Sequence, residues 1–300
     1  MPTEDNIDIT SEQTARLMTR ASHASVAAGS SLVLIKMVAF LYTGSVAMLT
    51  SLIDSSIDVI ASLINLFAVR QSLVPADQEH RFGHGKIESL AGILQAAFIS
   101  ASVIFIVIEA INKLVHPSPV THGALGIAVM IISMIVTILL VMYQRYVIKK
   151  TGSVVISADS LHYVSDLAFN ASVIVAIVLS YYFNLTYADP VIALIIAVFI
   201  LMSVKEIAKT CIDQLMDREL PDEDRDKIKE IVVSHPDVQG IHGYRTRASG
   251  RDIFIQLHLE LDPDLKLRRA HNIADEVQEQ ICQAYPNADV IIHQDPEDDQ

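Results

Sequence analysis

Several residue types are scarce in this 300-residue chain, and each scarcity excludes a class of protein. There is no Trp, and the only two Cys, Cys211 and Cys282, lie far apart and outside any CxxC spacing. These thiols therefore predict neither a disulfide framework nor a thiolate metal site. Basic residues are also few, at 22 Lys and Arg against 35 Asp and Glu. A net charge of −13 argues against a nucleic-acid partner, because such proteins carry basic surfaces.

A cleavable signal peptide is also missing from the N-terminus. The first 20 residues, MPTEDNIDITSEQTARLMTR, are polar and acidic, and they lack the basic start and short apolar core of a secretory signal. We expect residues 1–22 to remain in the mature chain as a cytoplasmic N-terminal segment.

Apolar residues are abundant, which places the chain among membrane proteins. Hydrophobic residues make up 51% of it and the mean hydropathy is +0.40. A bilayer core of about 30 Å needs about 20 apolar residues in a helix. Runs of that kind predict an all-α bundle of six transmembrane helices within residues 23–212. We place the helices near 24–46, 49–72, 88–113, 123–146, 153–182 and 187–211.

The orientation of this bundle follows from its basic residues. Arg81, Lys86, Lys149 and Lys150 fall in loops on one side, and Lys113 is nearly alone on the other. The positive-inside rule then places both termini in the cytoplasm. The fourth run, GALGIAVMIISMIVTILLVMY, is apolar all round and is expected to face lipid.

A soluble domain is predicted over residues 213–296, followed by an acidic tail at 297–300. From residue 213 onward there are 10 Lys and Arg against 21 Asp and Glu. In RDIFIQLHLELD, apolar residues at 253, 255, 257 and 259 alternate with Phe254, Gln256, His258 and Glu260, which is typical of a half-buried strand. Helical and strand patterns together predict a small cytoplasmic α+β domain with an α-β-β-α-β order and one open sheet face.

Two pairs of ionisable residues stand out within the apolar runs. Asp54 and Asp58 are spaced i and i+4, and so are His162 and Asp166 in SLHYVSDLAFN. On helices, each pair lies on one face about one turn apart. If the two helices converge, three carboxylates and one imidazole form a ligand set suited to tetrahedral Zn²⁺.

A bound dication would compensate for the cost of these charges in lipid. An ionised Asp at the bilayer centre costs about 2.5 kcal/mol or more on insertion scales. The alternative is that the carboxylates cap helices or pair with Lys36 and Ser hydroxyls. That alternative would require two pairs with the same i and i+4 spacing to arise by coincidence. Other polar residues near the same faces are candidates to line a path or to orient the ligands: Asp159, Asn170, Ser55 and Ser62.

Two further clusters have the chemistry of metal ligands. Asp77, His80 and His84 lie within eight residues of a loop, where they could hold a metal or be incidental to glycine turns. In the soluble domain, His293 and Asp295 share a strand face, and His258 falls on the open side of its strand. The residues alone do not establish that these histidines converge.

Lys86 and Asp217 form a separate candidate pair. One opens the third helix, and the other follows the sixth at the cytoplasmic membrane boundary. We expect them to pair, within one chain or between two, and to hold the helices relative to the soluble domain. An exposed pair contributes about 1 kcal/mol or less, so such a role requires partial burial.

Taken together, the motifs TGSVAMLTSLIDSSIDVIASLINL, RFGHGKIESLAG and DVIIHQDP resemble the cation diffusion facilitator family. The similarity runs from about residue 14 to residue 296 and is strongest to bacterial members that export zinc and ferrous iron. The acidic N-terminal extension is the main departure from the family pattern.

The resemblance implies a homodimeric antiporter in the bacterial inner membrane. It would export Zn²⁺, and also Fe²⁺ or Cd²⁺, in exchange for protons at a transport site of Asp54, Asp58, His162 and Asp166. It also implies a loop metal site at Asp77, His80 and His84. A metallochaperone-like domain would hold a binuclear zinc site across the dimer interface, with Gln294 contributing. The implied ligands of that site are His242, His258, His271, His293 and Asp295.

The residues independently support proton coupling and zinc preference. Metal ligands must lose their protons to bind, so metal and protons compete for one site. An imidazole ordinarily titrates near neutral pH, which makes His162 the member best placed to exchange a proton. A nitrogen ligand also favours Zn²⁺ over Mn²⁺, which prefers oxygen ligands. No organic cofactor is expected.

Two other functions would use the same ligands. A membrane metallohydrolase would need a general base and an open metal position, but HExxH is absent and no Ser or Cys has the context of a nucleophile. A metal sensor anchored by its helices would have no use for ligand pairs in two separate helices. A proton-coupled exporter is therefore the prediction.

Overall fold

The computed structural model describes residues 11–116, 124–183 and 187–297. The chain divides into two compact units. One comprises Met1–Val74 and Ile87–Ile212, and the other comprises Pro75–Lys86 together with Asp213–Gln300. The loop that carries Asp77, His80 and His84 thus belongs to the same unit as the C-terminal domain.

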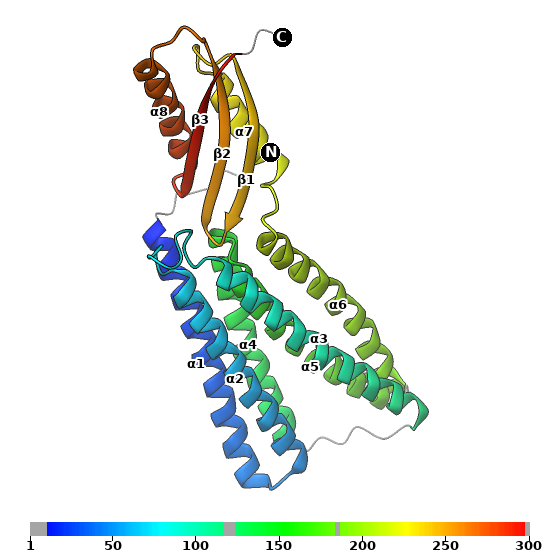
Figure 1. Cartoon of the computed structure of the whole chain (residues 1–300). Coiled ribbons are helices and arrows are strands. Elements are labelled where there is room, and N and C mark those ends of the chain that lie inside the picture. The colour runs from blue at the N-terminus through cyan, green and yellow to red at the C-terminus, as the bar shows by residue number, and fades with distance from the viewer. Residues whose placement is uncertain (1–10, 117–123, 184–186, 298–300) are drawn as a thin grey trace. The chain divides into compact units, whose positions relative to one another are not determined.

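The first unit is built from six long helices (Figure 1). Within the described residues, five of them are long and apolar enough to cross a membrane, namely all but α5. Helix α5 is equally long and carries Asp159, His162 and Asp166. The predicted helical membrane domain is confirmed. The helices are α1 (Ser11–Thr43), α2 (Val46–Ser72), α3 (Lys86–Val115), α4 (Ala124–Thr151), α5 (Val154–Phe183) and α6 (Ala188–Leu215).

Two short connections fix which helices are neighbours. Helix α1 is followed by Gly44 and helix α4 by Gly152, and both glycines have positive φ, at 60° and 65°. That conformation closes a helix end and reverses the chain at little steric cost when the residue is glycine. Consequently α1 packs along α2 and α4 packs along α5, while α1 also packs against α4. The four helices bring residues far apart in sequence onto facing surfaces.

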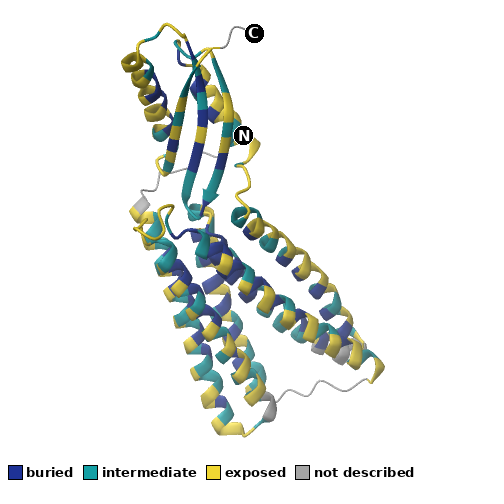
Figure 2. Ribbon diagram, in the orientation of Figure 1, coloured by how far each residue is buried: buried dark blue, intermediate teal, exposed yellow. Residues whose placement is uncertain are grey.

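Helix α4 differs from its prediction. The sequence predicted an apolar run that faces lipid, and it did not predict that one side of the helix, with Ser133, Thr137, Gln144 and Val147, would be buried. These residues recur at intervals of three, four and seven, so they form one face of the helix. Buried and exposed positions alternate along the helices of this unit (Figure 2), and on α4 Leu139 and Met142 are exposed. A few small or polar residues on one face are enough to turn it inward, although the helix is apolar overall.

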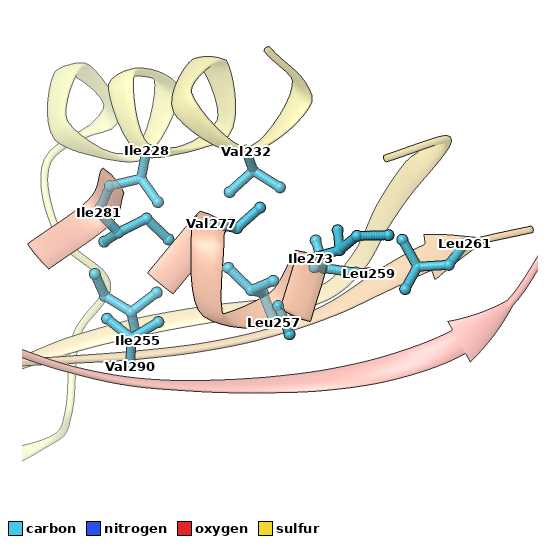
Figure 3. Close-up of a cluster of buried hydrophobic side chains, with 11 residues drawn as sticks. Ile228, Val232, Ile255, Leu257, Leu259, Leu261, Ile273, Val277, Ile281 and Val290 are labelled. Carbon is cyan, nitrogen blue, oxygen red and sulfur yellow. The ribbon is translucent and has the colours of Figure 1, made fainter. Parts of the chain in front are cut away.

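The second unit has the predicted α-β-β-α-β order. Strands β1 and β2 are antiparallel, β2 and β3 are parallel, and the sheet order is β1-β2-β3. Helices α7 and α8 cover one face of this sheet (Figures 1 and 3). The elements are α7 (Asp222–Val233), β1 (Gly240–Ser249), β2 (Asp252–Leu261), α8 (Leu267–Ala284) and β3 (Ala288–Pro296).

The core of this unit lies between the sheet and the two helices. Ile255, Leu257 and Leu259 of β2 are at most 1% exposed, as their alternation with polar residues predicted. Apolar side chains at helical spacing on α7 and α8 pack against them (Figure 3). These are Ile228, Val232, Ile273, Val277 and Ile281. The polar side chains of β2 are left on the opposite face, where His258 lies.

Two adjacent valines on α7 test this core. Val232 is fully buried and Val233 is 55% exposed. We expect Val232→Ala to destabilise the domain by about 2 kcal/mol, because it removes two buried methyl groups. Modification of Cys282, a half-buried thiol packed against the core, reports the opening of the domain. Its rate in the full chain should rise by up to about thirtyfold. Val233→Ala is the matched control, and equal rates in the two variants would contradict this packing.

Candidate metal centres

Three of the four residues predicted for the intramembrane site converge between α2 and α5. His162 Nε2 lies 2.9 Å from Asp58 Oδ1 and 3.6 Å from Asp166 Oδ2. One ligand atom from each residue lies within 4.8 Å of the other two. The i and i+4 spacing on α5 places His162 and Asp166 on one face, and the packing of α2 on α5 brings Asp58 to them. This geometry suits a single small cation.

Asp54 is not within this group of three. It lies one turn before Asp58 on α2 and is exposed, whereas the Asp58 side chain is 15% exposed. The side chains of His162 and Asp166 are 11% and 37% exposed. Exposure therefore increases from Asp58 and His162 toward Asp54 and Asp166. As arranged here, the site has three close ligands and a fourth carboxylate at its more open side.

A buried polar network lies one turn from His162 along α5. Asp159 Oδ2 accepts hydrogen bonds from Ser25 of α1 at 2.6 Å and from Gln144 of α4 at 2.7 Å. Its Oδ1 accepts one from Asn65 of α2 at 2.9 Å. All four side chains are at most 4% exposed. Asp159 thus joins all four helices, and three donors satisfy a carboxylate that is buried away from water.

Sequence reasoning placed Asp159 near the site but missed its partners on α1 and α4. Ser25 and Gln144 are single polar residues in apolar runs, and their positions carry no spacing signal. Tyr163, which is next to His162, was also missed. Its hydroxyl lies 2.9 Å from Ser62 Oγ and donates to the Ser25 carbonyl. These contacts fix the rotation of α5 and so the direction in which His162 points.

The loop residues Asp77, His80 and His84 also come together. Asp77 Oδ1 lies 3.5 Å from His80 Nδ1, and its Oδ2 lies 3.4 Å from His84 Nε2. Asp77 Oδ1 accepts hydrogen bonds from the backbone N–H groups of His80 and Glu79, which lowers the pKa of this carboxyl. A carboxylate and two imidazoles within 4.8 Å can supply three ligands to a metal ion.

This loop packs against the β1–β2 hairpin within its own compact unit. The ring of Phe82 makes an edge contact with Phe254 at 5.5 Å between centroids, and the Arg247 guanidinium lies 4.7 Å from the centroid of each ring. Gly85 fits closely on the hairpin, because a Cβ there would lie 2.1 Å from the Ser249 carbonyl oxygen. Phe254 is buried for this reason, although the alternation of β2 placed it on the open face.

Lys86 and Asp217 meet at the same place, within one chain. Lys86 Nζ lies 2.8 Å from Asp217 Oδ1, and Arg247 Nη1 lies 3.2 Å from the same oxygen. Burial raises the pKa of the Asp217 carboxyl, but hydrogen bonds from Lys86 and Arg247 outweigh it and hold the pKa below its usual range. Asp217 has φ 55°, a strained conformation for a residue other than glycine. Two cations thus share one strained acceptor.

A row of three histidines crosses the open face of the sheet. In the strand register, His242 is opposite His258, and His258 is opposite His293. Asp295, two residues along β3 from His293, contacts all three imidazoles at 2.7 to 3.1 Å. The hydrogen bond from His258 lowers the pKa of the Asp295 carboxyl. Gly243 has φ 57°, and a Cβ there would lie 2.8 Å from the His258 ring. The pairing of the strands therefore assembles this cluster.

His271 is the predicted ligand that this chain does not bring to the cluster. It lies on α8 and contacts Asp275 at 3.5 Å. Helix α8 covers the opposite face of the sheet from the histidine row. Glu260, in contrast, was not predicted, yet its carboxylate lies 2.8 Å from His242 Nδ1. Glu260 lies opposite Gly240, diagonally across the strand pair from His242, and such a neighbour is visible only once the register is known.

Comparison with known proteins matches both units to one family. Residues 22–216 match the family described as the cation efflux transmembrane domain. Residues 220–297 match the family described as the cation efflux protein cytoplasmic domain. The two matches correspond to the helical unit and to the α-β-β-α-β unit, and together they cover most of the chain.

Individual relatives agree with these matches. The cation-efflux pump FieF of Salmonella choleraesuis is 48% identical over 281 residues, covering 94% of this chain and 93% of the relative. FieF of Salmonella paratyphi A is 47% identical over the same length. Among solved structures, a chain of the proposed zinc transporter CzrB is 28% identical and a nickel form of the MamM CTD is 23% identical. Each match covers 26% of this chain, and the matches cover 99% and 100% of the two solved chains. The TM-scores are 0.26 and 0.25.

The ion pairs of Asp217 predict how firmly the loop is held. Replacing Asp217 with Asn removes the charge that attracts Lys86 and Arg247, so the loop should detach more often. We expect tryptic cleavage after the exposed Arg81 to become about fivefold faster, which corresponds to about 1 kcal/mol for partly exposed pairs. Asp213→Asn is the control, because Asp213 pairs with Arg218 instead. A simultaneous Lys86→Asp and Asp217→Lys swap should fail to restore protection, since a lysine at 217 would face Arg247. Full restoration would contradict the shared acceptor.

Proposed function

The chain belongs to the cation efflux family, and we propose that it exports Zn²⁺ from the cytoplasm in exchange for protons. Membership makes it a multi-pass membrane transporter with a cytoplasmic C-terminal domain, and not an enzyme. The proposal concerns the cargo, the coupling and the residues that bind. Fe²⁺ and Cd²⁺ are the other divalent ions that the same ligands would accept, and a bacterial inner membrane is the proposed location.

The convergence of Asp58, His162 and Asp166 is the observation that carries the proposal. These three ionisable side chains lie on two membrane helices, where each ionised group is costly unless it is compensated. Two carboxylates and one imidazole provide three ligands, and Asp54 supplies the fourth when its side chain turns inward. The resulting oxygen and nitrogen set matches the tetrahedral preference of Zn²⁺.

Proton exchange follows from the chemistry of the same ligands. A carboxylate or imidazole binds metal only when deprotonated, so each metal ion that arrives displaces protons and each proton that arrives weakens metal binding. His162 hydrogen-bonds Asp58 and lies beside Asp166. Protons on these groups would balance the charge of the site whenever metal has left it. Alternating access to the two sides of the membrane turns this competition into antiport.

The cytoplasmic clusters support a second role for metal, in regulation. The histidine row with Asp295 lies on an open sheet face, and the loop trio is held against the β1–β2 hairpin. We assign Zn²⁺ to both as a structural ion. His271 lies on the far side of the sheet within one chain, so we propose that it reaches the histidine row of a second copy. The functional form is then a homodimer bridged by metal.

Export by reconstituted protein tests the transport site. We expect full-length chain in liposomes to move Zn²⁺ when a pH gradient is imposed. Asp58→Ala should reduce the initial rate at least a hundredfold, because it removes a ligand from the centre of the group. Glu109→Gln is the matched control, since Glu109 is an exposed acidic residue of α3 outside the three ligand groups of the described chain. Transport by Asp58→Ala at the parent rate would exclude this site.

Acidification should release zinc from the cytoplasmic cluster. Because the pKa of Asp295 is lowered, this carboxylate stays ionised in mild acid. Metal ligands bind only when deprotonated, so added protons compete with Zn²⁺ for the cluster. In a chain that also carries Asp58→Ala and His80→Ala, Zn²⁺ affinity measured by calorimetry should fall as the pH drops from about 7 to about 5.5. Asp295→Asn should weaken binding about tenfold or more at every pH. Binding by Asp295→Asn at the parent affinity would contradict this assignment.

A further inference from the structure

Lys36 is the feature of the membrane unit that the proposed function does not use. It is the only Lys or Arg within residues 24–46, and it lies in the middle of an apolar run. A charged side chain at such a depth is costly and usually marks a functional site. The other five apolar runs contain no basic residue over residues 49–69, 88–112, 124–144, 154–183 and 187–204.

The structure shows where the Lys36 ammonium group is held. Its Nζ donates to Ser55 Oγ at 2.6 Å and to the Ser51 carbonyl oxygen at 3.3 Å, both on α2. Ser55 is 2% exposed. Neither bond is to a carboxylate, so the sequence-based alternative that Lys36 pairs directly with an Asp does not describe this arrangement. Two neutral acceptors orient the ammonium and leave its charge uncancelled.

This fixed charge lies beside the transport ligands. Ser55 directly follows Asp54 and precedes Asp58 by three residues, which is a rise of about 4.5 Å along a helix. The ammonium acts electrostatically on the carboxylates of Asp54 and Asp166. Helix α2 leads into the 75–86 loop, which belongs to the cytoplasmic unit, so Ser51 and Ser55 are on the outward side of Asp58. Lys36 is therefore near the end of the site from which metal leaves.

The position of Lys36 matters because its charge enters the charge balance of the transport site. Asp54, Asp58 and Asp166 carry three negative charges when ionised, and Zn²⁺ cancels two of them. The Lys36 ammonium cancels the third, so the site is neutral when it holds one divalent ion. Asp159 forms a separate layer one turn toward the cytoplasm, where Ser25, Asn65 and Gln144 satisfy it.

We propose that Lys36 is a positioning residue that sets the charge of the transport site, so that one dication neutralises it and the hold on metal is weakened at release. This inference rests on the proposed transport site. Without the ammonium, the loaded site keeps one uncancelled negative charge, and metal is held more tightly. A purely structural lysine would have the opposite signature, because its loss loosens the helices and weakens binding.

Zinc affinity and turnover in matched variants test the proposal. The full chain in lipid nanodiscs carries Asp77→Ala and His258→Ala, so that calorimetry with Zn²⁺ at one fixed pH reports only the membrane site. Lys36→Met should bind Zn²⁺ about tenfold more tightly, because it removes the repulsion between the ammonium and the metal. A repulsion of this size is expected between charges at this range in a partly screened site. In liposomes its KM for Zn²⁺ and its maximal export rate should both fall several-fold. Lys36→Arg should restore the parent values.

Two further variants separate charge from other effects. Lys36→Gln can still donate to Ser55 but carries no charge, so it should behave like Lys36→Met. Parent-like affinity in Lys36→Gln, or unchanged or weaker affinity in Lys36→Met, overturns the proposal. Lys113→Met is the control for loss of a membrane lysine, since Lys113 pairs with Asp189 instead. If Asp58→Ala binds Zn²⁺ as the parent does, the transport site itself is wrong, and this inference falls with it.

Discussion

The requirement that buried charge be neutralised is the constraint on which the rest of this structure depends. The helical unit places three ionisable ligands within 4.8 Å of one another, on helices that are otherwise largely apolar. In such surroundings an unpaired carboxylate is unstable, and the site must hold either metal or protons. In the function that we propose, the exchange of one for the other is a consequence of the site's location. Transport also requires that the site open alternately to the two sides of the membrane.

The four-helix network around Asp159 keeps the ligands in place. Hydrogen bonds from α1, α2 and α4 meet on one carboxylate of α5, one turn from His162. A network in which each donor comes from a different helix resists rotation of any of them, because turning one helix would leave buried polar atoms without partners. The candidate ligands on α2 and α5 are thus held by contacts that lie outside the site.

The sequence predicted the features that follow from periodicity. Apolar runs located the helices, the i and i+4 pairs located three side chains that converge between α2 and α5, and the alternation in β2 located the core of the cytoplasmic unit. Contacts that depend on register or on single polar residues were not predictable. Ser25 and Gln144 have no pattern around them, and the row of His242, His258 and His293 exists only because the three strands pair as they do. Phe82 lies in the 75–86 loop, and its contact with Phe254 could not be predicted without the hairpin beside it.

Proton release on zinc binding is the measurement that tests the central claim most directly. Calorimetry in buffers of different ionisation enthalpy counts the protons displaced when Zn²⁺ enters the membrane site of a chain whose loop and cytoplasmic ligands have been removed. If metal and protons alternate at Asp58, His162 and Asp166, binding releases at least one proton per ion, and His162→Ala reduces that number. Zinc binding that releases no protons, or a count unchanged in His162→Ala, would contradict the account.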